Sequence, residues 1–234
     1  MKATDVLADL KSLANSERAK NNQWFFKTGK GEYGEGDQFW GLTVPQVRSV
    51  VKQYKDLSLN EIVKLLHHKV HEVRLCAVLL LVAQYKNNPD LVYKTYLENT
   101  KYINNWDLVD CSAGYIVGPY LEHKDKDILT TLAHSNNVWE RRIAMISTFY
   151  YIYNGHSQEA LRIAEILVND KHDLIQKAVG WMLREIGKRC SIEEEEVFLK
   201  KYAATMPRTA LRYAIERFTP EKKSHYMNLH KNLQ

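Results

Sequence analysis

The stretch Glu72-Val73-Arg74-Leu75-Cys76-Ala77 decides the fold, because its pattern of a polar helix start followed by an alanine recurs along the chain. The pattern returns in Arg141-Arg142-Ile143-Ala144 and in Gln176-Lys177-Ala178. Alanines that fit this alignment are separated by 36, 31, 34 and 36 residues: Ala77, Ala113, Ala144, Ala178 and Ala214. A repeat of this length indicates stacked pairs of helices that bury a continuous core between neighbours.

More polar helices are expected between the apolar ones, at 124–133, 157–168 and 191–202. Period-two alternation is essentially absent, whereas apolar residues recur every three or four positions. The prediction is therefore an all-α fold, an α-solenoid of HEAT-like helical repeats. A single domain over residues 1–234 is expected, with its inner helices lining a concave surface.

Helix starts are marked by capping side chains. Ser58-Leu59-Asn60-Glu61 and Ser191-Ile192-Glu193-Glu194 match capping boxes, in which a hydroxyl and a carboxylate satisfy the first free amides. Asn88-Pro89, Thr219-Pro220 and Thr43-Val44-Pro45 place a capping residue before a proline that a helix tolerates in its first turn. The acidic run from Glu193 to Glu196 is explained by the favourable charge at a helix start.

Composition is that of an ordinary globular chain, with 45% hydrophobic and 26% charged residues. The longest apolar run, from Cys76 to Ala83, is too short to cross a bilayer, and no signal-peptide core follows Met1. The three cysteines are scattered without a CxxC pair and are expected to be small core residues. These features predict a cytoplasmic protein.

The net charge of +5 is concentrated near the C-terminus. Residues 171–234 contain 13 Lys and Arg against 8 Asp and Glu, whereas residues 1–170 contain 20 of each. This concentration favours an anionic partner. The basic side chains concerned form either a solvated helix face or a phosphate-binding surface: Arg208, Arg212, Arg217, Lys222 and Lys223.

Two further motifs are assigned structural roles. The segment 27–41 holds four glycines between Gly29 and Gly36 but lacks the Gly-Lys-Ser/Thr ending of a P-loop, so a flexible lid or surface loop is expected. His67, His68 and His71 lack the zinc-protease spacing and are interpreted as a solvated helix end. No metal and no cofactor are predicted.

Three helix starts carry a tryptophan close to charged residues: Trp106-Asp107-Leu108-Val109-Asp110, Val138-Trp139-Glu140-Arg141-Arg142 and Gly180-Trp181-Met182-Leu183-Arg184. Each indole alone is explained by core packing. Taken together, they are expected to meet on one inner surface. Asp110 lies one helical turn after Trp106, and an aspartate in an otherwise apolar helix costs stability unless it is paired or used.

These segments resemble the AlkD family of DNA alkylation-repair glycosylases over most of the chain. The resemblance rests on 106–110, on Asn137–Ala144, on Ile175–Glu185 and, near the N-terminus, on Gly41–Arg48. The glycines at 29–36 depart from the best-known members. The family implies a solenoid that grips duplex DNA in its concavity. It also implies release of 3-methyladenine and 7-methylguanine without flipping the base into a pocket.

By this resemblance, Asp110, Trp106 and Trp181 are the catalytic residues, and Arg142 contacts a phosphate. Other basic and aromatic side chains on the repeats are predicted to bind DNA: Trp139, Arg141, Lys177, Arg184, Arg208 and Arg212. The expected partner is double-stranded DNA containing alkylated bases, bound by a monomer. The predicted activity is that of a monofunctional glycosylase, which hydrolyses the N-glycosidic bond of cationic purines.

The chemistry of such a lesion fits these residue types. A purine alkylated at N3 or N7 is cationic and leaves as a neutral base, so positive charge develops on the deoxyribose. Asp110 would stabilise that charge, and each indole would add about 0.5–2 kcal/mol of cation–π attraction. Two alternatives stay open: a non-catalytic binder of damaged or branched DNA, which would not need Asp110, and a protein-interaction solenoid.

Overall fold

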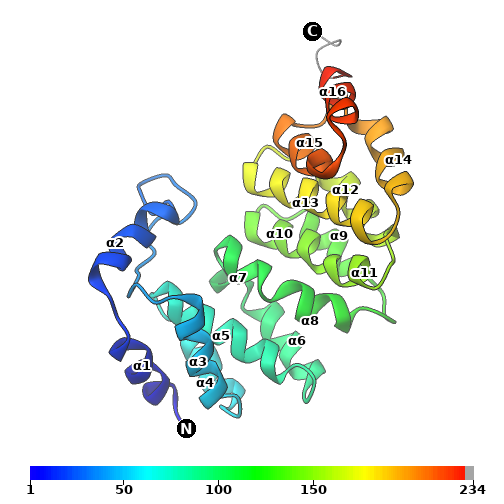
Figure 1. Ribbon diagram of the computed structural model, residues 1–234. Helices are drawn as coiled ribbons and strands as arrows, with labels where there is room; N and C mark the ends of the chain where they lie inside the picture. Colours follow the sequence, from blue (N-terminus) through cyan, green and yellow to red (C-terminus); the bar gives the residue numbers. More distant parts are fainter. Residues whose placement is uncertain (230–234) are drawn as a thin grey trace. The chain divides into compact units, whose positions relative to one another are not determined.

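The computed structural model describes residues 1–229 and is built from helices (Figure 1). Within residues 1–229 there is no β-strand, and Gln38 and Val70 form an isolated parallel bridge. The predicted all-α class is therefore confirmed. None of the helices in this range is both long and apolar enough to span a membrane. The chain divides into two compact units, Met1–Ile116 and Val117–Gln234, and each is described by itself.

Unit 1 is organised around the apolar helix α5 (His71–Gln84), which contacts α3, α4, α6 and α7. Its residues from His71 to Leu81 are all buried, so this helix forms the centre of the core. The other elements that belong wholly to unit 1 are α1 (Ala3–Ser12), α2 (Ser16–Phe25), α3 (Val44–Gln53), α4 (Leu59–Leu66), α6 (Pro89–Glu98), the 3-10 helix η1 (Thr100–Tyr102) and α7 (Trp106–Asp110).

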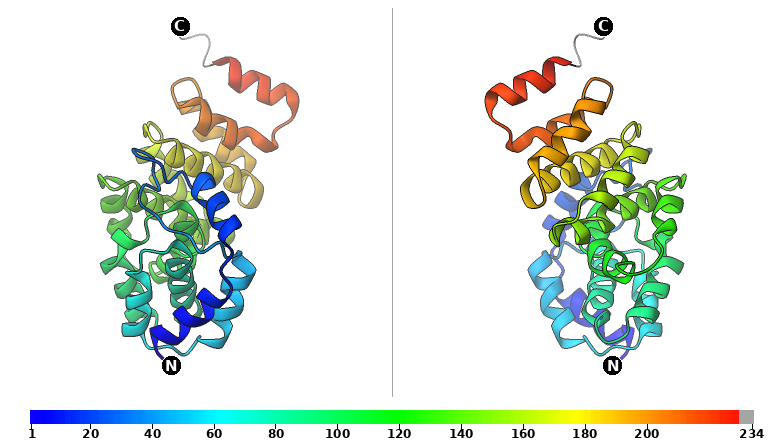
Figure 2. Two further views of the ribbon diagram at one scale, coloured as in Figure 1. Left: turned by 90° about the vertical axis from the view of Figure 1, so that its left-hand side faces the viewer. Right: turned by 90° about the vertical axis from the view of Figure 1, so that its right-hand side faces the viewer.

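Unit 2 is organised around α13 (Asp173–Arg189), which packs against α10, α12, α14 and α15. In Figures 1 and 2, α10, α13 and α15 follow one another as neighbours, as in a helical repeat stack. Helix α8 (Ala113–Tyr120) runs across the boundary between the units. The remaining elements are α9 (Asp127–Ala133), α10 (Val138–Ser147), α11 (Phe149–Tyr153), α12 (Gln158–Leu167), α14 (Ile192–Tyr202), α15 (Arg208–Ala214), η2 (Ile215–Arg217) and α16 (Pro220–Leu229).

The small residues that revealed the repeat lie where helices approach closely. All five aligned alanines are completely buried. Gly180 also lies at a close contact between helices. A Cβ at this position would lie 2.3 Å from the carbonyl oxygen of Ala210 and 2.5 Å from the Cβ of Tyr213. Only a residue without a side chain lets α13 and α15 pack at that distance. The repeat pattern in the sequence therefore reports helix-to-helix packing.

Most of the predicted helix starts are found. Thr43 and Gln46 form a reciprocal capping box at α3, and the Ser191 hydroxyl accepts from two amides of α14. Helix α4 does begin after Ser58, but the predicted box is wrong, because the Ser58 side chain makes no capping bond. Glu61 instead accepts a hydrogen bond from the backbone amide of Ala3 at 2.7 Å, so its carboxylate ties α1 to α4.

The glycine-rich segment consists of turns and bends, and its second half is tied to the start of α5. The buried carboxylate of Glu72 accepts hydrogen bonds from the successive amides of Trp40, Gly41 and Leu42 at 3.0, 2.8 and 3.1 Å. Gly41 has φ +78°, and a Cβ there would lie 2.1 Å from the Asn15 carbonyl oxygen. The carboxylate of Glu72 thus holds residues 40–42 in place. The sequence analysis did not predict this contact.

The interpretation of the three histidines as a solvated helix end is wrong for His71. His67 is the C-cap of α4, whereas His71 opens α5, so the two do not share a helix. His67 is exposed, but His71 is only 1% exposed. The physical reason is that acidic side chains from distant segments meet both nitrogens of the His71 ring.

The acidic run at the start of α14 also differs from the prediction at one position. The Ser191 hydroxyl donates to Glu193, and a charge there suits the helix start as expected. Glu195, in contrast, is 2% exposed, and its Oε1 has no hydrogen-bond partner within residues 1–229. Burial, helped by neighbouring Glu196, raises the pKa of Glu195 to about 8. The helix dipole therefore does not account for the whole run.

Candidate functional site

A hollow of about 490 Å³ in unit 1 contains the predicted tryptophan–aspartate pair. Trp106 and Asp110 line it together, as their spacing of one helical turn predicts. Apolar side chains of α5 contribute part of its wall, and charged side chains of α3 and α7 contribute the polar groups. The complete lining consists of Arg48, Leu79, Val82, Trp106, Asp107, Asp110, Cys111 and Tyr115.

The short helix α7 presents these groups because its other face is anchored in the core. The buried Asn105 side chain caps the helix by accepting from the Trp106 amide at 2.8 Å. Leu108 and Val109 are completely buried. Trp106, Asp107 and Asp110 occupy the remaining face and are half-buried. Asp110 is therefore partly shielded from water, which strengthens its interaction with a cation in the hollow.

An aromatic stack holds the Trp106 indole from behind. Its ring lies on Phe26 with centroids 5.5 Å apart and planes inclined by 22°. Phe26 in turn stacks on Phe39 at 5.2 Å, and Phe25 meets the indole edge-on at 6.1 Å. Such contacts fix ring orientation as well as burying area. Phe25, Phe26 and Phe39 come from the end of α2 and the glycine-rich segment, so that segment supports the site.

The His71 ring, which lies against Phe26 and Phe39, is bonded to two carboxylates. His71 Nε2 is 2.8 Å from Asp107 Oδ2, and His71 Nδ1 is 3.3 Å from Asp37 Oδ2. Arg74 donates to the other oxygen of Asp37 at 2.6 Å. Asp107 also accepts from the Leu108 amide at 2.9 Å, so both its oxygens are engaged. Asp107 is therefore committed to orienting the helix start.

Other groups in the hollow were not among the predicted site residues. Arg48 is exposed on α3 and brings a positive charge to the rim, and Tyr115 is 56% exposed. Arg48 closes the Gly41–Arg48 motif, which was the available signal for it, but its position beside Asp110 depends on the packing of α3 against α5. The pKa of Cys111 is raised by burial and by Asp107 and Asp110, which keeps its thiol protonated and poorly nucleophilic.

In unit 2, Trp181 lies on α13 with a half-buried indole. Phe149 of α11 tilts against it with centroids 6.1 Å apart. The Arg189 guanidinium lies over the rings of Phe149 and Tyr153, at 5.4 and 5.1 Å from their centroids. The same guanidinium pairs with Glu185 at 2.8 Å, so this surface combines aromatic rings with a cation that is already partly engaged. Aromatic rings beside a cation suit nucleic acid. The two predicted catalytic tryptophans belong to different units.

Arg142 and Trp139 lie in the core of unit 2. Arg142 is 5% exposed and donates to the carbonyl oxygen of Leu174 at 2.5 Å, which links α10 to α13. Trp139 is 7% exposed. Arg141 pairs with Asp170 at 2.7 Å and also donates to the Ser135 carbonyl. These contacts are structural, and DNA contact by these residues stays a prediction.

The remaining basic residues differ in how far they are already engaged. Lys177 pairs with Asp173 at 2.8 Å, Arg184 pairs with Glu216, and Arg208 donates to the Met227 carbonyl at 2.9 Å. Arg212 is exposed and makes no ion pair within the described part of the chain. Arg212 is therefore the predicted DNA-binding residue whose charge is most available to an external anion.

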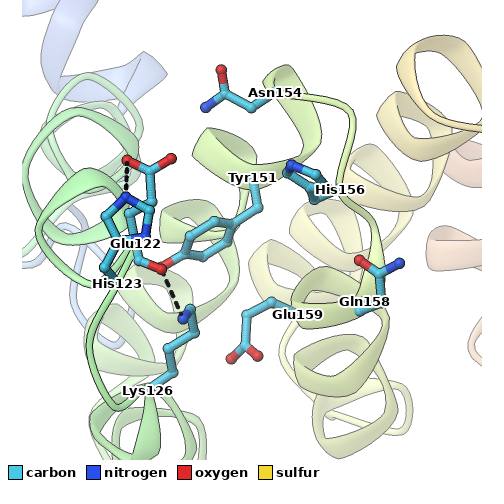
Figure 3. Close-up of a pocket in the computed structure, with 8 residues that line it drawn as sticks. All are labelled: Glu122, His123, Lys126, Tyr151, Asn154, His156, Gln158 and Glu159. Carbon is cyan, nitrogen blue, oxygen red and sulfur yellow. Dashed lines mark hydrogen bonds and ion pairs between the residues drawn. The ribbon is translucent and has the colours of Figure 1, made fainter.

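A second hollow, of about 410 Å³, lies in unit 2 (Figure 3). In the close-up, the ring of Tyr151 lies between the side chains of Glu122 and Lys126 on one side and those of Gln158 and Glu159 on the other. Several of its polar groups are bonded to backbone carbonyls: Lys126 donates to the Glu122 carbonyl at 3.2 Å, and the Tyr151 hydroxyl donates to the Gly118 carbonyl at 3.0 Å. Across residues 1–229, no group of three His, Cys, Asp or Glu side chains could hold a metal ion.

The fold and the unit 1 hollow define an all-helical repeat protein with a tryptophan–carboxylate site. A model of the DNA alkylation repair enzyme family matches residues 6–218, so the chain belongs to that family. A solved structure described as a predicted DNA alkylation repair enzyme from Enterococcus faecalis is similar, with a TM-score of 0.69 and 18% identity. The similarity covers 88% of this chain and 97% of that one, and it supports the α-solenoid fold. A search of curated proteins gave no match.

Proposed function

We propose that the protein is a monofunctional DNA glycosylase that releases cationic alkylated purines, such as 3-methyladenine and 7-methylguanine, from duplex DNA. Membership of the alkylation repair family supports the general role. The observation that carries the specific reaction is the hollow in which Trp106 and Asp110 lie together. A half-buried carboxylate beside an indole face suits a sugar that becomes positively charged.

The reaction follows from the charge of the lesion. The bond between C1′ and the purine nitrogen breaks, and its electron pair neutralises the cationic base, so no acid is needed to protonate the leaving group. The deoxyribose is left with positive charge, which Asp110 stabilises across the hollow. Water then adds to C1′ and loses a proton, completing hydrolysis. Arg48, at the rim of the same hollow, is suited to a neighbouring phosphate.

We assign unit 2 a role in holding the duplex. Trp181, Arg189 and the exposed Arg212 offer an aromatic surface and charge for the DNA backbone. Arg142 is buried, so it would affect DNA binding by holding α13 in position through its bond to Leu174. It would contact DNA directly only if binding broke that bond. We further propose that the protein works as a cytoplasmic monomer. A non-catalytic DNA binder is the alternative, and it has no need of Asp110.

The decisive test is release of methylated bases from N-methylated duplex DNA, separated by chromatography under single-turnover conditions. We expect the wild-type protein to release 7-methylguanine, and Asp110→Asn to be slower by about 10²–10³-fold, the usual loss when one electrostatic group is removed. Asp56→Asn, the same change at an exposed aspartate in unit 1, is the matched control and should retain full activity. Tight DNA binding without base release by the wild type would favour the non-catalytic alternative.

A further inference from the structure

The His71 ring is enclosed by groups from three parts of unit 1. Asp37 approaches from the glycine-rich segment, Asp107 from α7, and Arg74 lies on His71's own helix. Phe26 and Phe39 lie against the imidazole with centroids 4.7 and 4.8 Å away and contribute no charge. The ring therefore has a carboxylate at each nitrogen and aromatic rings as neighbours.

This geometry fixes the protonation of the imidazole. An ionised carboxylate can only accept hydrogen bonds, and a neutral imidazole carries one N–H. Two carboxylates, one at each nitrogen, are both satisfied only by the doubly protonated ring. Burial alone would lower the pKa of His71, but the charges and hydrogen bonds of Asp107 and Asp37 outweigh it and raise the pKa to about 9. Burial opposes ionisation of Asp37, yet its bonds to His71 and Arg74 leave its pKa lowered.

His71 contacts several of the groups that support Trp106. The His71 amide donates to the Gln38 carbonyl at 2.8 Å, which joins α5 to the glycine-rich segment. Phe26, whose ring is tilted against that of His71, also stacks on the Trp106 indole. Asp107, the residue after Trp106, is bonded to His71 and lines the hollow with Asp110. His71 thus links the segment, the aromatic stack and the first turn of α7.

We propose that His71 is a positioning residue: as an imidazolium that bridges Asp37 and Asp107, it holds the second half of the glycine-rich segment against α7 and so sets the orientation of Trp106 in the candidate site. Loss of the proton leaves one carboxylate facing a nitrogen lone pair. Asp37 keeps Arg74, whereas Asp107 keeps only the Leu108 amide. Asp107 therefore keeps the remaining N–H, because its bond to the ring is the shorter one at 2.8 Å, and the 3.3 Å link to Asp37 in the glycine-rich segment is the one that weakens.

The direction of the pH dependence follows from the raised pKa. The unperturbed value is 6.5, and the folded value is about 9. The bridge therefore contributes its full stability below pH 6.5 and loses it as the pH rises through about 9. A segment tied down at neutral pH and loosened above pH 9 is the expected behaviour.

The test follows the histidine ring signals of the full chain by NMR from pH 6 to pH 10, together with amide hydrogen exchange of residues 37–42. His71 should titrate near pH 9, and the protection factors of the amides at 37–42, which divide out the base-catalysed rise of exchange with pH, should fall about tenfold through the same midpoint. Asp107→Asn removes one carboxylate and should lower both midpoints by at least about one pH unit. His67→Gln, at an exposed histidine, is the control for the His71→Gln variant and should alter neither midpoint.

Either of two results would overturn the positioning role: His71 titrating near its ordinary value, or protection factors at 37–42 that do not change as His71 titrates. His71→Gln provides a second variant, in which the pH-dependent step in protection should vanish. Only one part rests on the proposed function, namely that base release by the wild type declines with the same midpoint. If the wild type releases no base at any pH, that function fails, while ring titration and amide exchange still decide the role of His71.

Discussion

The helices that carry Trp106 and Trp181 present their indoles in different surroundings. Helix α7 is one short turn whose outer face lines a hollow with two carboxylates. Helix α13 is a 17-residue element at the centre of unit 2, and near Trp181 the Arg189 guanidinium lies over the aromatic rings while it pairs with Glu185 at 2.8 Å. Negative charge beside an indole suits a developing cation, whereas positive charge beside aromatic rings suits phosphates and bases.

This difference suggests that the two tryptophan motifs, which are similar in sequence, serve different roles. Each motif places a tryptophan near ionisable residues. In unit 1 the ionisable partner shares the hollow with the indole, and in unit 2 the arginines of the motifs are largely engaged in packing and ion pairs. We therefore expect chemistry to depend on unit 1 and DNA affinity to depend on unit 2.

Replacing each tryptophan should affect the rate of base release and the affinity for DNA differently in the two units. Trp106→Ala removes the indole beside Asp110 and the stacking surface on Phe26, so base release should fall by about tenfold at saturating enzyme. Trp181→Ala should weaken DNA binding while the single-turnover rate of bound substrate changes less. Both are measured by pairing fluorescence anisotropy with base release. Equal losses of rate in the two variants would erase the distinction between the units.

In unit 2, the buried carboxylate of Glu195 predicts that the stability of the protein depends on pH. Glu195 is buried with a pKa raised to about 8 from the unperturbed 4.5, so its stabilising contribution belongs to the protonated form. That contribution is complete below pH 4.5 and is lost as the pH rises through about 8. Glu195→Gln keeps the shape without the charge, and at pH 8.5 it should raise the free energy of unfolding by about 1–3 kcal/mol.

Chemical denaturation at pH 5 and pH 8.5 checks this prediction, and the gain should be confined to the higher pH. Glu193→Gln is the matched control, because Glu193 is exposed at the helix start. Base release should be unchanged in both variants. A Glu195→Gln protein that is no more stable than the wild type at pH 8.5 would show that the buried carboxylate has partners that compensate its charge.

The smallest effect concerns the exposed charge of Arg212. Arg212→Ala should reduce the slope of log affinity against log salt by about 0.9, the amount expected for one phosphate contact. Arg212→Lys retains the charge and should keep the slope. Binding of unmodified duplex DNA, measured by anisotropy between low and moderate salt, provides the data. A slope unaltered in Arg212→Ala would remove this residue from the proposed DNA surface.

Local signals in the sequence predicted much of the architecture. Aligned alanines and capping residues are decided within one or two helical turns, which is why the buried positions and most helix starts were found. The pairing of Trp106 with Asp110 was predictable for the same reason, since both lie on one short helix.

Contacts between distant segments were not predictable in this way. The partners of His71 lie 34 and 36 residues away, so its burial as a bridged ring has no local signature. The same holds for Glu72, which binds amides about 30 residues earlier, and for Arg142, whose bonded carbonyl is 32 residues later. Charged residues in these positions looked solvent-exposed or DNA-binding because their internal partners could not be seen.

Duplexes that carry analogues of the reacting sugar can show whether Asp110 stabilises a cationic deoxyribose. One contains a cationic pyrrolidine in place of the deoxyribose, and the other a neutral tetrahydrofuran of the same shape. If the Asp110 carboxylate is placed to stabilise a cationic sugar, the wild type should bind the cationic duplex at least about tenfold more tightly, and Asp110→Asn should lose that preference while binding the neutral duplex equally well. A wild-type protein that binds both duplexes alike, or an Asp110→Asn variant that keeps the preference, would contradict the account.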